Sequence, residues 1–213
     1  MNDRSNPSVG GLSLALLVAA CGVGLFAMPA PVVAQQAQAS GAIHGTVDAR
    51  PAAARASAVV YLETVPGTFR PPAAHPRIDQ RGLQFLPHVL AIVRGTTVDF
   101  LNSDNVRHNV FSPDGVTYNL GSWPQGEVRP QTFTSLGVFR QLCQIHPEMQ
   151  SFVLVLANPY FAITDAEGAF RIANVPPGTY TLRVWSERLP ATTQQVTVTA
   201  GGDLVVNPVL RRQ

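Results

Sequence analysis

From residue 41 onward the chain is divided into short apolar, β-branched runs, each bounded by glycine, proline or other turn residues. Residues 58–63 and 151–156 are two such runs. Runs of about four to eight residues with turn signals between them are typical of β-strands. No window in this part of the chain has the apolar spacing of an amphipathic helix. The sequence therefore predicts an all-β fold.

The N-terminal segment is different in character. Residues 12–28 are almost wholly apolar and are followed by small residues and prolines up to Ala34, so residues 1–34 are predicted to be a signal peptide. Two alternatives stay open. The Val-Ala-Ala-Cys sequence ending at Cys21 resembles a bacterial lipobox, and an uncleaved anchor is compatible with a run approaching the ~20 residues that span a bilayer. All three predict a periplasmic or otherwise extracytoplasmic protein, and two attach it to a membrane.

The charge pattern argues against a nucleic-acid partner. Charged residues are 13% of the chain, the net charge is +2, and no basic run is present. Cleavage after Ala34 would leave about 179 residues, enough for two small domains.

One stretch concentrates metal-binding side chains. Cys143, His146 and Met149 are spaced three residues apart, and His108 follows the strand-like residues 97–101. A run this short can turn as one tight loop at the end of a strand and direct its three side chains to one point. Two imidazole nitrogens and a thiolate with a weak axial thioether are the ligand set of a blue-copper site. Calcium and magnesium would instead require oxygen ligands.

The cysteine supports this interpretation. A lone cysteine is commonly a small buried apolar residue. Once a signal peptide is removed, however, Cys143 is the single cysteine, so it cannot form an intramolecular disulfide and is at risk of oxidation outside the cytoplasm. Coordination of a metal would explain why it is kept.

Residues 64–157 resemble a cupredoxin, a Greek-key β-sandwich, and the C-x-x-H-P-x-M spacing is similar to the ligand loop of the amicyanin branch. Residues 83–87 and 95–100 resemble the strands that precede the first ligand. The resemblance implies one copper ion that cycles between Cu(I) and Cu(II). Its implied ligands are His108, Cys143, His146 and Met149.

The same resemblance implies that Asn109 ties the two ligand loops together through the backbone near Gln144. Three residues depart from the family pattern. Gln141 stands where an aromatic is usual, Leu142 stands where plastocyanins carry a tyrosine, and Glu148 places an acid beside the loop.

For function, the resemblance implies a one-electron carrier rather than an enzyme, with electrons passing through the face around His146 and Pro147. Its implied partners are a c-type cytochrome or a quinoprotein dehydrogenase. Two alternatives remain open: a copper storage or trafficking protein, and a structural or carbohydrate-binding surface module. Of the other histidines, His44 and His75 are expected to be structural, whereas His88 is the one expected nearest the site.

The C-terminal part has a second pattern. Residues 164–185 resemble a carboxypeptidase regulatory-like module, a small prealbumin-like β-sandwich whose usual opening strands match residues 41–47 and 58–63. We therefore predict a nested order, in which residues 41–63 and 158–213 form this module around an inserted cupredoxin domain, with residues 35–40 as a tether. In the serial alternative, residues 58–63 are the first cupredoxin strand.

Overall fold

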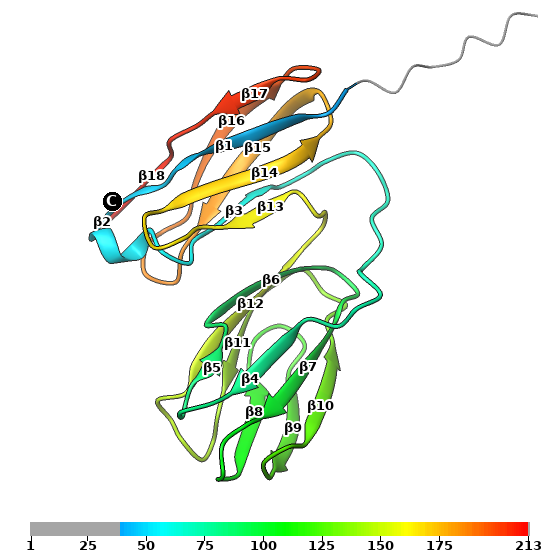
Figure 1. Cartoon of the computed structure of the whole chain (residues 1–213), viewed down its shortest axis with the longest axis vertical. Coiled ribbons are helices and arrows are strands. Elements are labelled where there is room, and N and C mark those ends of the chain that lie inside the picture. Colours follow the sequence, from blue (N-terminus) through cyan, green and yellow to red (C-terminus); the bar gives the residue numbers. More distant parts are fainter. Residues whose placement is uncertain (1–38, 213) are drawn as a thin grey trace, which may run out of the picture. The chain divides into compact units, whose positions relative to one another are not determined.

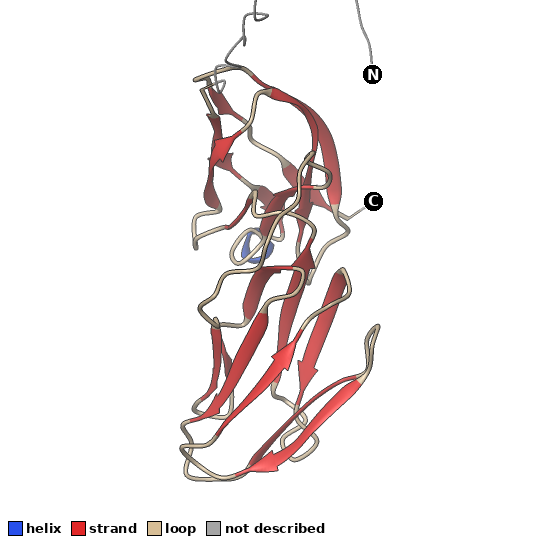
Figure 2. Ribbon diagram, turned by 90° about the vertical axis from the view of Figure 1, so that its right-hand side faces the viewer, coloured by secondary structure: helices blue, strands red, loops and turns tan. Residues whose placement is uncertain are grey.

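The computed structural model describes residues 39–212, and their regular secondary structure is almost all β-strand, joined by turns and loops (Figure 2). Within that range the single helix is a 3-10 turn, Ala52–Ala54. The predicted all-β fold is therefore confirmed. No helix in the described range is long and apolar enough to cross a membrane. The predicted signal segment and most of the tether lie outside the described residues.

Residues 77–156 form a sandwich of two sheets, which we call the first sandwich. One sheet has the order β10 (Val128–Thr132), β7 (Thr97–Asn102), β4 (Arg77–Gln80) and β5 (Phe85–Leu86). The other has the order β6 (Val89–Val93), β12 (Gln150–Leu156), β11 (Gly137–Leu142), β8 (His108–Ser112) and β9 (Tyr118–Trp123).

The core of this sandwich follows from the alternation of its strands. In β7 every second residue is buried, so Val98 and Phe100 point inward while their neighbours are partly exposed. They belong to one apolar cluster that also contains Trp123, Cys143 and Met149. Two of the predicted copper ligands are therefore held by the packed core rather than by a free loop.

Strand β12 lacks this alternation because both of its faces are covered. Val153 and Val155 pack in the core of the first sandwich, whereas Phe152, Leu154 and Leu156 belong to a separate apolar cluster. That second cluster also includes Val59, with Tyr61, Phe161 and Trp185 packed against it. A strand buried on both faces needs a continuous apolar run.

The remaining strands form a second sandwich. One of its sheets has the order β14 (Ala169–Val175), β1 (Gly41–Thr46) and β17 (Asp203–Val205). The other has the order β13 (Phe161–Ile163), β3 (Val59–Leu62), β15 (Gly178–Trp185) and β16 (Thr192–Val198). A short pair joins β2 (Asp48–Arg50) to β18 (Val209–Arg211).

Strands far apart in the sequence alternate in this second sandwich. Figure 1 shows the blue strand β1 between the orange β14 and the red β17, and β3 likewise lies between β13 and β15. Residues 59–62, which the serial alternative assigned to the cupredoxin, pair instead with strands on the C-terminal side of it. The described residues of both sandwiches belong to one compact unit.

Two glycines permit close backbone contacts within the second sandwich. A Cβ atom on Gly45 would lie 1.8 Å from the Val206 carbonyl oxygen. Gly168 ends the predicted turn before β14 with φ at 88°, and a Cβ atom there would lie 2.5 Å from the Val47 carbonyl oxygen. Early and late segments can approach this closely only without side chains at these positions.

One predicted strand is shorter than expected. Residues 83–87 shorten to the two-residue β5, because Gly82 and Leu83 adopt positive φ values of 62° and 57° and make a turn. The preceding strand β4 was not predicted from the sequence, since its Arg-Ile-Asp-Gln sequence is mostly polar.

Candidate metal centre

Two adjacent strands bring the predicted ligands together. His108 is the first residue of β8, and Cys143 directly follows Leu142, the last residue of β11. Leu142 pairs with Phe111 of β8, so the start of one strand and the end of the other lie at the same end of the sheet. Strand pairing therefore spans the 35 positions that separate these two ligands in the sequence.

The side chains of His108, Cys143 and His146 converge. Their potential ligand atoms lie within 4.8 Å of one another. The Nδ1 atom of His146 is 3.0 Å from Nδ1 of His108 and 3.9 Å from Sγ of Cys143. His108 is fully buried and Cys143 is 4% exposed, whereas His146 is only partly buried. The cluster thus lies just beneath the surface, with one imidazole facing outward.

Met149 closes the ligand loop. Its backbone N–H donates to the His146 carbonyl oxygen at 3.0 Å, and β12 begins at the next residue. Its side chain is 1% exposed and packs in the same core cluster as Cys143. The run from Cys143 to Met149 is therefore the tight loop expected from the sequence, with the thioether on its buried side.

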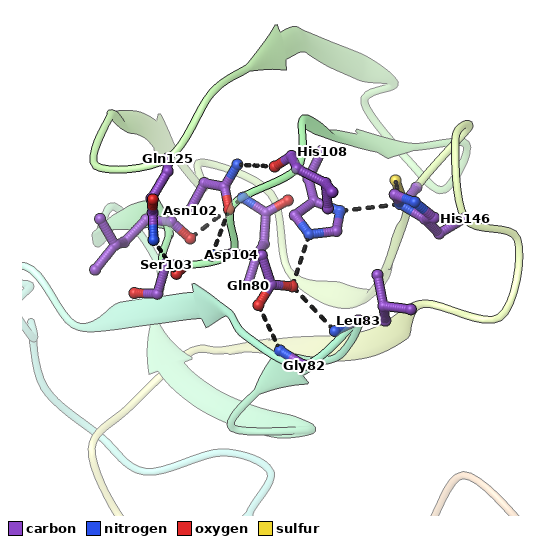
Figure 3. A network of polar contacts seen from close by, with 12 residues as sticks. Gln80, Gly82, Leu83, Asn102, Ser103, Asp104, His108, Gln125 and His146 are labelled. Carbon is purple, nitrogen blue, oxygen red and sulfur yellow. Dashed lines mark hydrogen bonds and ion pairs between the residues drawn. The ribbon is translucent and has the colours of Figure 1, made fainter.

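Asp104 orients the buried histidine (Figure 3). Its Oδ2 atom is 2.9 Å from Nε2 of His108 and 3.0 Å from the N–H of Leu83, and its Oδ1 atom accepts from the Gly82 N–H at 2.7 Å. A carboxylate accepts hydrogen bonds, so the His108 proton lies on Nε2. The other ring nitrogen, Nδ1, faces Nδ1 of His146 at 3.0 Å.

The Asp104 carboxylate is held in its ionised form. Burial would raise its pKa, but the hydrogen bonds from Leu83, Gly82 and His108 together lower the pKa below its usual value. Asn102 holds the Asp104 loop, because its side chain accepts from the Asp104 N–H at 2.9 Å and donates to the Val106 carbonyl at 2.8 Å.

Asn109 joins the two ligand-bearing segments. Its side-chain oxygen accepts from the Gln144 N–H at 3.3 Å, and its own backbone N–H points at Cys143 Sγ at 3.5 Å. Its side-chain nitrogen donates to Asn119 Oδ1 and to the Gly121 carbonyl, both at 2.8 Å. These two contacts hold the segment that carries Cys143 against β8.

The residues that depart from the family pattern have defined places. Gln141 is fully buried, accepts a hydrogen bond from the Tyr118 hydroxyl and donates to the Phe139 carbonyl at 2.9 Å. Burial is the main reason that the pKa of Tyr118 is raised. Leu142 is partly buried, and Glu148 is exposed. None of the three takes the place of a ligand.

Each of the other three histidines pairs with a carboxylate. His44 lies 3.4 Å from Asp203, His75 lies 3.1 Å from Asp99, and His88 lies 2.8 Å from Glu187. His88 also lines a pocket of about 610 Å³ with Met149, so it is the spare histidine that borders the ligand loop. Sequence reasoning missed Asp104. Its position four residues before His108 was visible, but the loop that turns its carboxylate onto Nε2 was not.

The donor set suits copper. Two imidazole nitrogens and a soft sulfur converge in a mostly buried position, and a thioether lies in the same loop. This combination is typical of copper electron-transfer sites, while hard divalent cations prefer oxygen ligands. The four candidates would be His108, Cys143, His146 and Met149.

A family comparison identifies the C-terminal module. Residues 153–211 match the carboxypeptidase regulatory-like domain family, which overlaps the predicted module and begins within β12. Comparison with curated protein sequences gives no match.

Solved structures similar to this chain include a copper-containing nitrite reductase, a purple cupredoxin and amicyanin. A copper-containing nitrite reductase from Thermus scotoductus SA-01 has 28% identity over 44% of this chain and a TM-score of 0.38, and this chain covers 25% of it. A purple cupredoxin from Nitrosopumilus maritimus has 28% identity and a TM-score of 0.35, and the match covers 38% of this chain and 98% of the cupredoxin. A reduced variant of amicyanin has 22% identity over 46% of this chain and 98% of its own, with a TM-score of 0.37. Each of these similarities covers less than half of this chain.

Proposed function

We propose that this chain is an exported mononuclear type 1 copper protein that carries single electrons, and that it is not an enzyme. The observation that carries the proposal is the convergence of two imidazole nitrogens and the Cys143 sulfur within 4.8 Å. A copper ion bound there would supply a one-electron couple between Cu(I) and Cu(II). His108, Cys143 and His146 would be its equatorial ligands and Met149 its axial ligand.

The protein's contribution would be to keep one geometry in both oxidation states. His108 is fixed by Asp104, and the segment that carries Cys143 is fixed by the Asn109 hydrogen bond to Gln144. The burial of Cys143 and Met149 excludes water from the inner side of the site. Ligands that cannot move need little reorganisation when an electron arrives or leaves.

His146 would be the electron outlet, because it is the partly exposed member of the cluster. Apolar side chains near it in the sequence and in its network are unusually exposed: Ile145 at 47%, Val106 at 42% and Leu83 at 41%. Exposed apolar side chains around such a site would favour a protein partner. We propose a c-type cytochrome or a quinoprotein dehydrogenase in a periplasmic or other extracytoplasmic chain.

We further propose the nested domain order, with the cupredoxin domain at residues 64–157 inserted into a module made of residues 41–63 and 158–213. The pairing of β1 with β14 and β17, and of β3 with β13 and β15, supports these boundaries. The serial order would separate strands that share these sheets.

The test is a visible absorption spectrum of the full chain loaded with copper. An intense thiolate-to-copper band, lost in His108→Gln and kept in His75→Gln, supports the carrier. His75 is the matched control, because it also binds an aspartate but lies outside the cluster. Rapid loss of copper to a mild chelator would favour storage or trafficking, and absence of the band would overturn the type 1 assignment.

A further inference from the structure

The outer face of strand β12 is held by residues of the second sandwich. Phe152, the third residue of this strand, is 8% exposed. Its ring centroid lies 5.4 Å from that of Trp185, at the end of β15, and 5.6 Å from that of His88. Aromatic pairs at these separations are favourable beyond the area that they bury.

His88, a residue of the first sandwich, adds a second contact to this one. Its carbonyl oxygen accepts from the Phe152 N–H at 2.9 Å, so its backbone is tied to β12. Its Nε2 atom lies 2.8 Å from Oε2 of Glu187, two residues beyond Trp185. The Arg188 side chain also donates to Glu187, at 3.1 Å. Trp185 therefore contacts Phe152, and Glu187 contacts His88, from the same short segment of the second sandwich.

Phe152 and His88 lie close to Met149, the candidate axial ligand. Phe152 follows Met149 by three positions, and the intervening Gln150 and Ser151 pair with Leu142 and Gln141 of β11. On its open side, Met149 borders the pocket that His88, Phe85 and Glu148 also line. The start of β12 is thus held by β11 on one side, and by the His88 segment with its contacts to Trp185 and Glu187 on the other.

We propose that Trp185 and Glu187 are positioning residues for the copper site, acting through Phe152 and His88 on the end of the ligand loop that carries Met149. This inference rests on the proposed copper function. It gives the second sandwich a role in that function: it restrains the strand that follows the axial ligand, so the copper domain in this chain depends on the module around it.

The first test replaces the aromatic contact. In copper-loaded full-length protein, Trp185→Ala should speed the chelator-driven loss of copper by roughly threefold to tenfold, the range expected for loss of an aromatic pair. It should also change the relative intensities of the thiolate-to-copper bands, which report the axial interaction. Trp185→Phe should restore both properties. Unchanged release and spectrum in Trp185→Ala would overturn the proposal.

A second variant avoids a large cavity and has a matched control. Glu187→Gln removes the charge that faces His88 and Arg188, whereas Asp203→Asn removes an equivalent carboxylate that faces His44 and Arg171 elsewhere in the second sandwich. Glu187→Gln should speed copper release and Asp203→Asn should not. Equal effects of the two variants would contradict a specific positioning role.

Amide hydrogen exchange on metal-free protein separates failure of this proposal from failure of the copper assignment. Trp185→Ala and Glu187→Gln should speed exchange in residues 150–156 relative to Asp203→Asn, whether or not copper binds. If copper gives no thiolate band but the two variants speed amide exchange, Trp185 and Glu187 do restrain β12 and the proposed copper function is wrong. If the band forms but neither amide exchange nor copper release changes in the variants, the positioning role of Trp185 and Glu187 is wrong.

Discussion

The two sandwiches differ most in what they bury. Residues 77–156 bury eight polar side chains: Gln80, Thr96, Asn102, His108, Asn109, Ser112, Gln141 and Ser151. The second sandwich and the segments that connect its strands bury three polar side chains: Asn158, Thr164 and Ser186. Because burial of a polar group costs free energy unless it is hydrogen-bonded, this excess needs a reason. In the first sandwich, His108, Asn109 and Asn102 belong to the network around the candidate site.

The three polar groups of the second sandwich have local structural roles. The Thr164 hydroxyl donates to the Arg55 carbonyl at 2.6 Å and accepts from the Ala58 N–H at 2.8 Å. The Asn158 side chain donates to the Leu62 carbonyl at 2.8 Å. The difference is in what the hydrogen bonds hold. Three buried polar side chains of the first sandwich belong to one network around the candidate ligands, whereas those of the second sandwich hold backbone segments that carry no candidate ligand.

The largest expected effect comes from removing the sulfur. Cys143→Ser should abolish the visible copper band completely, because the thiolate is its source, while the all-β far-UV spectrum is kept. Absorption and circular dichroism of the same sample check this. Colour that persists in Cys143→Ser would show that the site is wrongly assigned.

The next effect concerns whether each region folds by itself. A polypeptide of residues 158–213 should be unfolded or aggregate, because β14 would lose β1, its antiparallel partner, and β15 would lose β3. Residues 41–63 joined to 158–213 through a short glycine linker should fold without copper. Thermal unfolding followed by circular dichroism checks both. Cooperative unfolding of residues 158–213 alone would favour the serial order.

A buried polar group of the second sandwich should affect stability without affecting colour. Thr164→Val should lower the free energy of unfolding by about 1–3 kcal/mol, since it leaves the Ala58 N–H without its partner. The copper band should stay unchanged. Chemical denaturation with absorption spectroscopy measures both properties, and a changed band would break the contrast between the two regions.

A smaller stability change is expected at the axial position. Met149→Leu conserves volume in the core and should cost less than about 1.5 kcal/mol. It should keep copper but raise the reduction potential, because loss of the thioether donor disfavours Cu(II). Redox titration is the measurement. An unchanged potential would place Met149 outside the site.

The smallest expected effect is a dependence of stability on pH. The Arg140 side chain binds Asp114 at 2.8 and 2.9 Å and holds the pKa of that carboxyl below its usual 3.8. The stabilisation is therefore fully present above that value and is lost as pH falls through the lower folded pKa. Asp114→Asn should lower the melting temperature slightly at pH 6 and remove this acid dependence. An unchanged acid profile would show that the pair contributes nothing.

The sequence by itself determined the all-β class and the motif that holds three of the four candidate ligands. Cys143, His146 and Met149 are close in the chain, so a turn of that length must keep their side chains close. It also indicated the second module, because Gly168 and its neighbours define a local turn. These inferences could be made from the sequence because they depend on residues within a few positions of one another.

The tertiary structure alone decided what crosses long stretches of chain. Pairing of β8 with β11 brings His108 to Cys143, and a turn held by Asp104 replaces part of the strand expected at residues 83–87. The contact of Phe152 with Trp185 was not visible either, because an apolar run shows that both faces of β12 are covered but not by what. The physical reason is that strand partners and loop conformations are selected by packing and hydrogen bonding over the whole fold, which local sequence patterns do not contain.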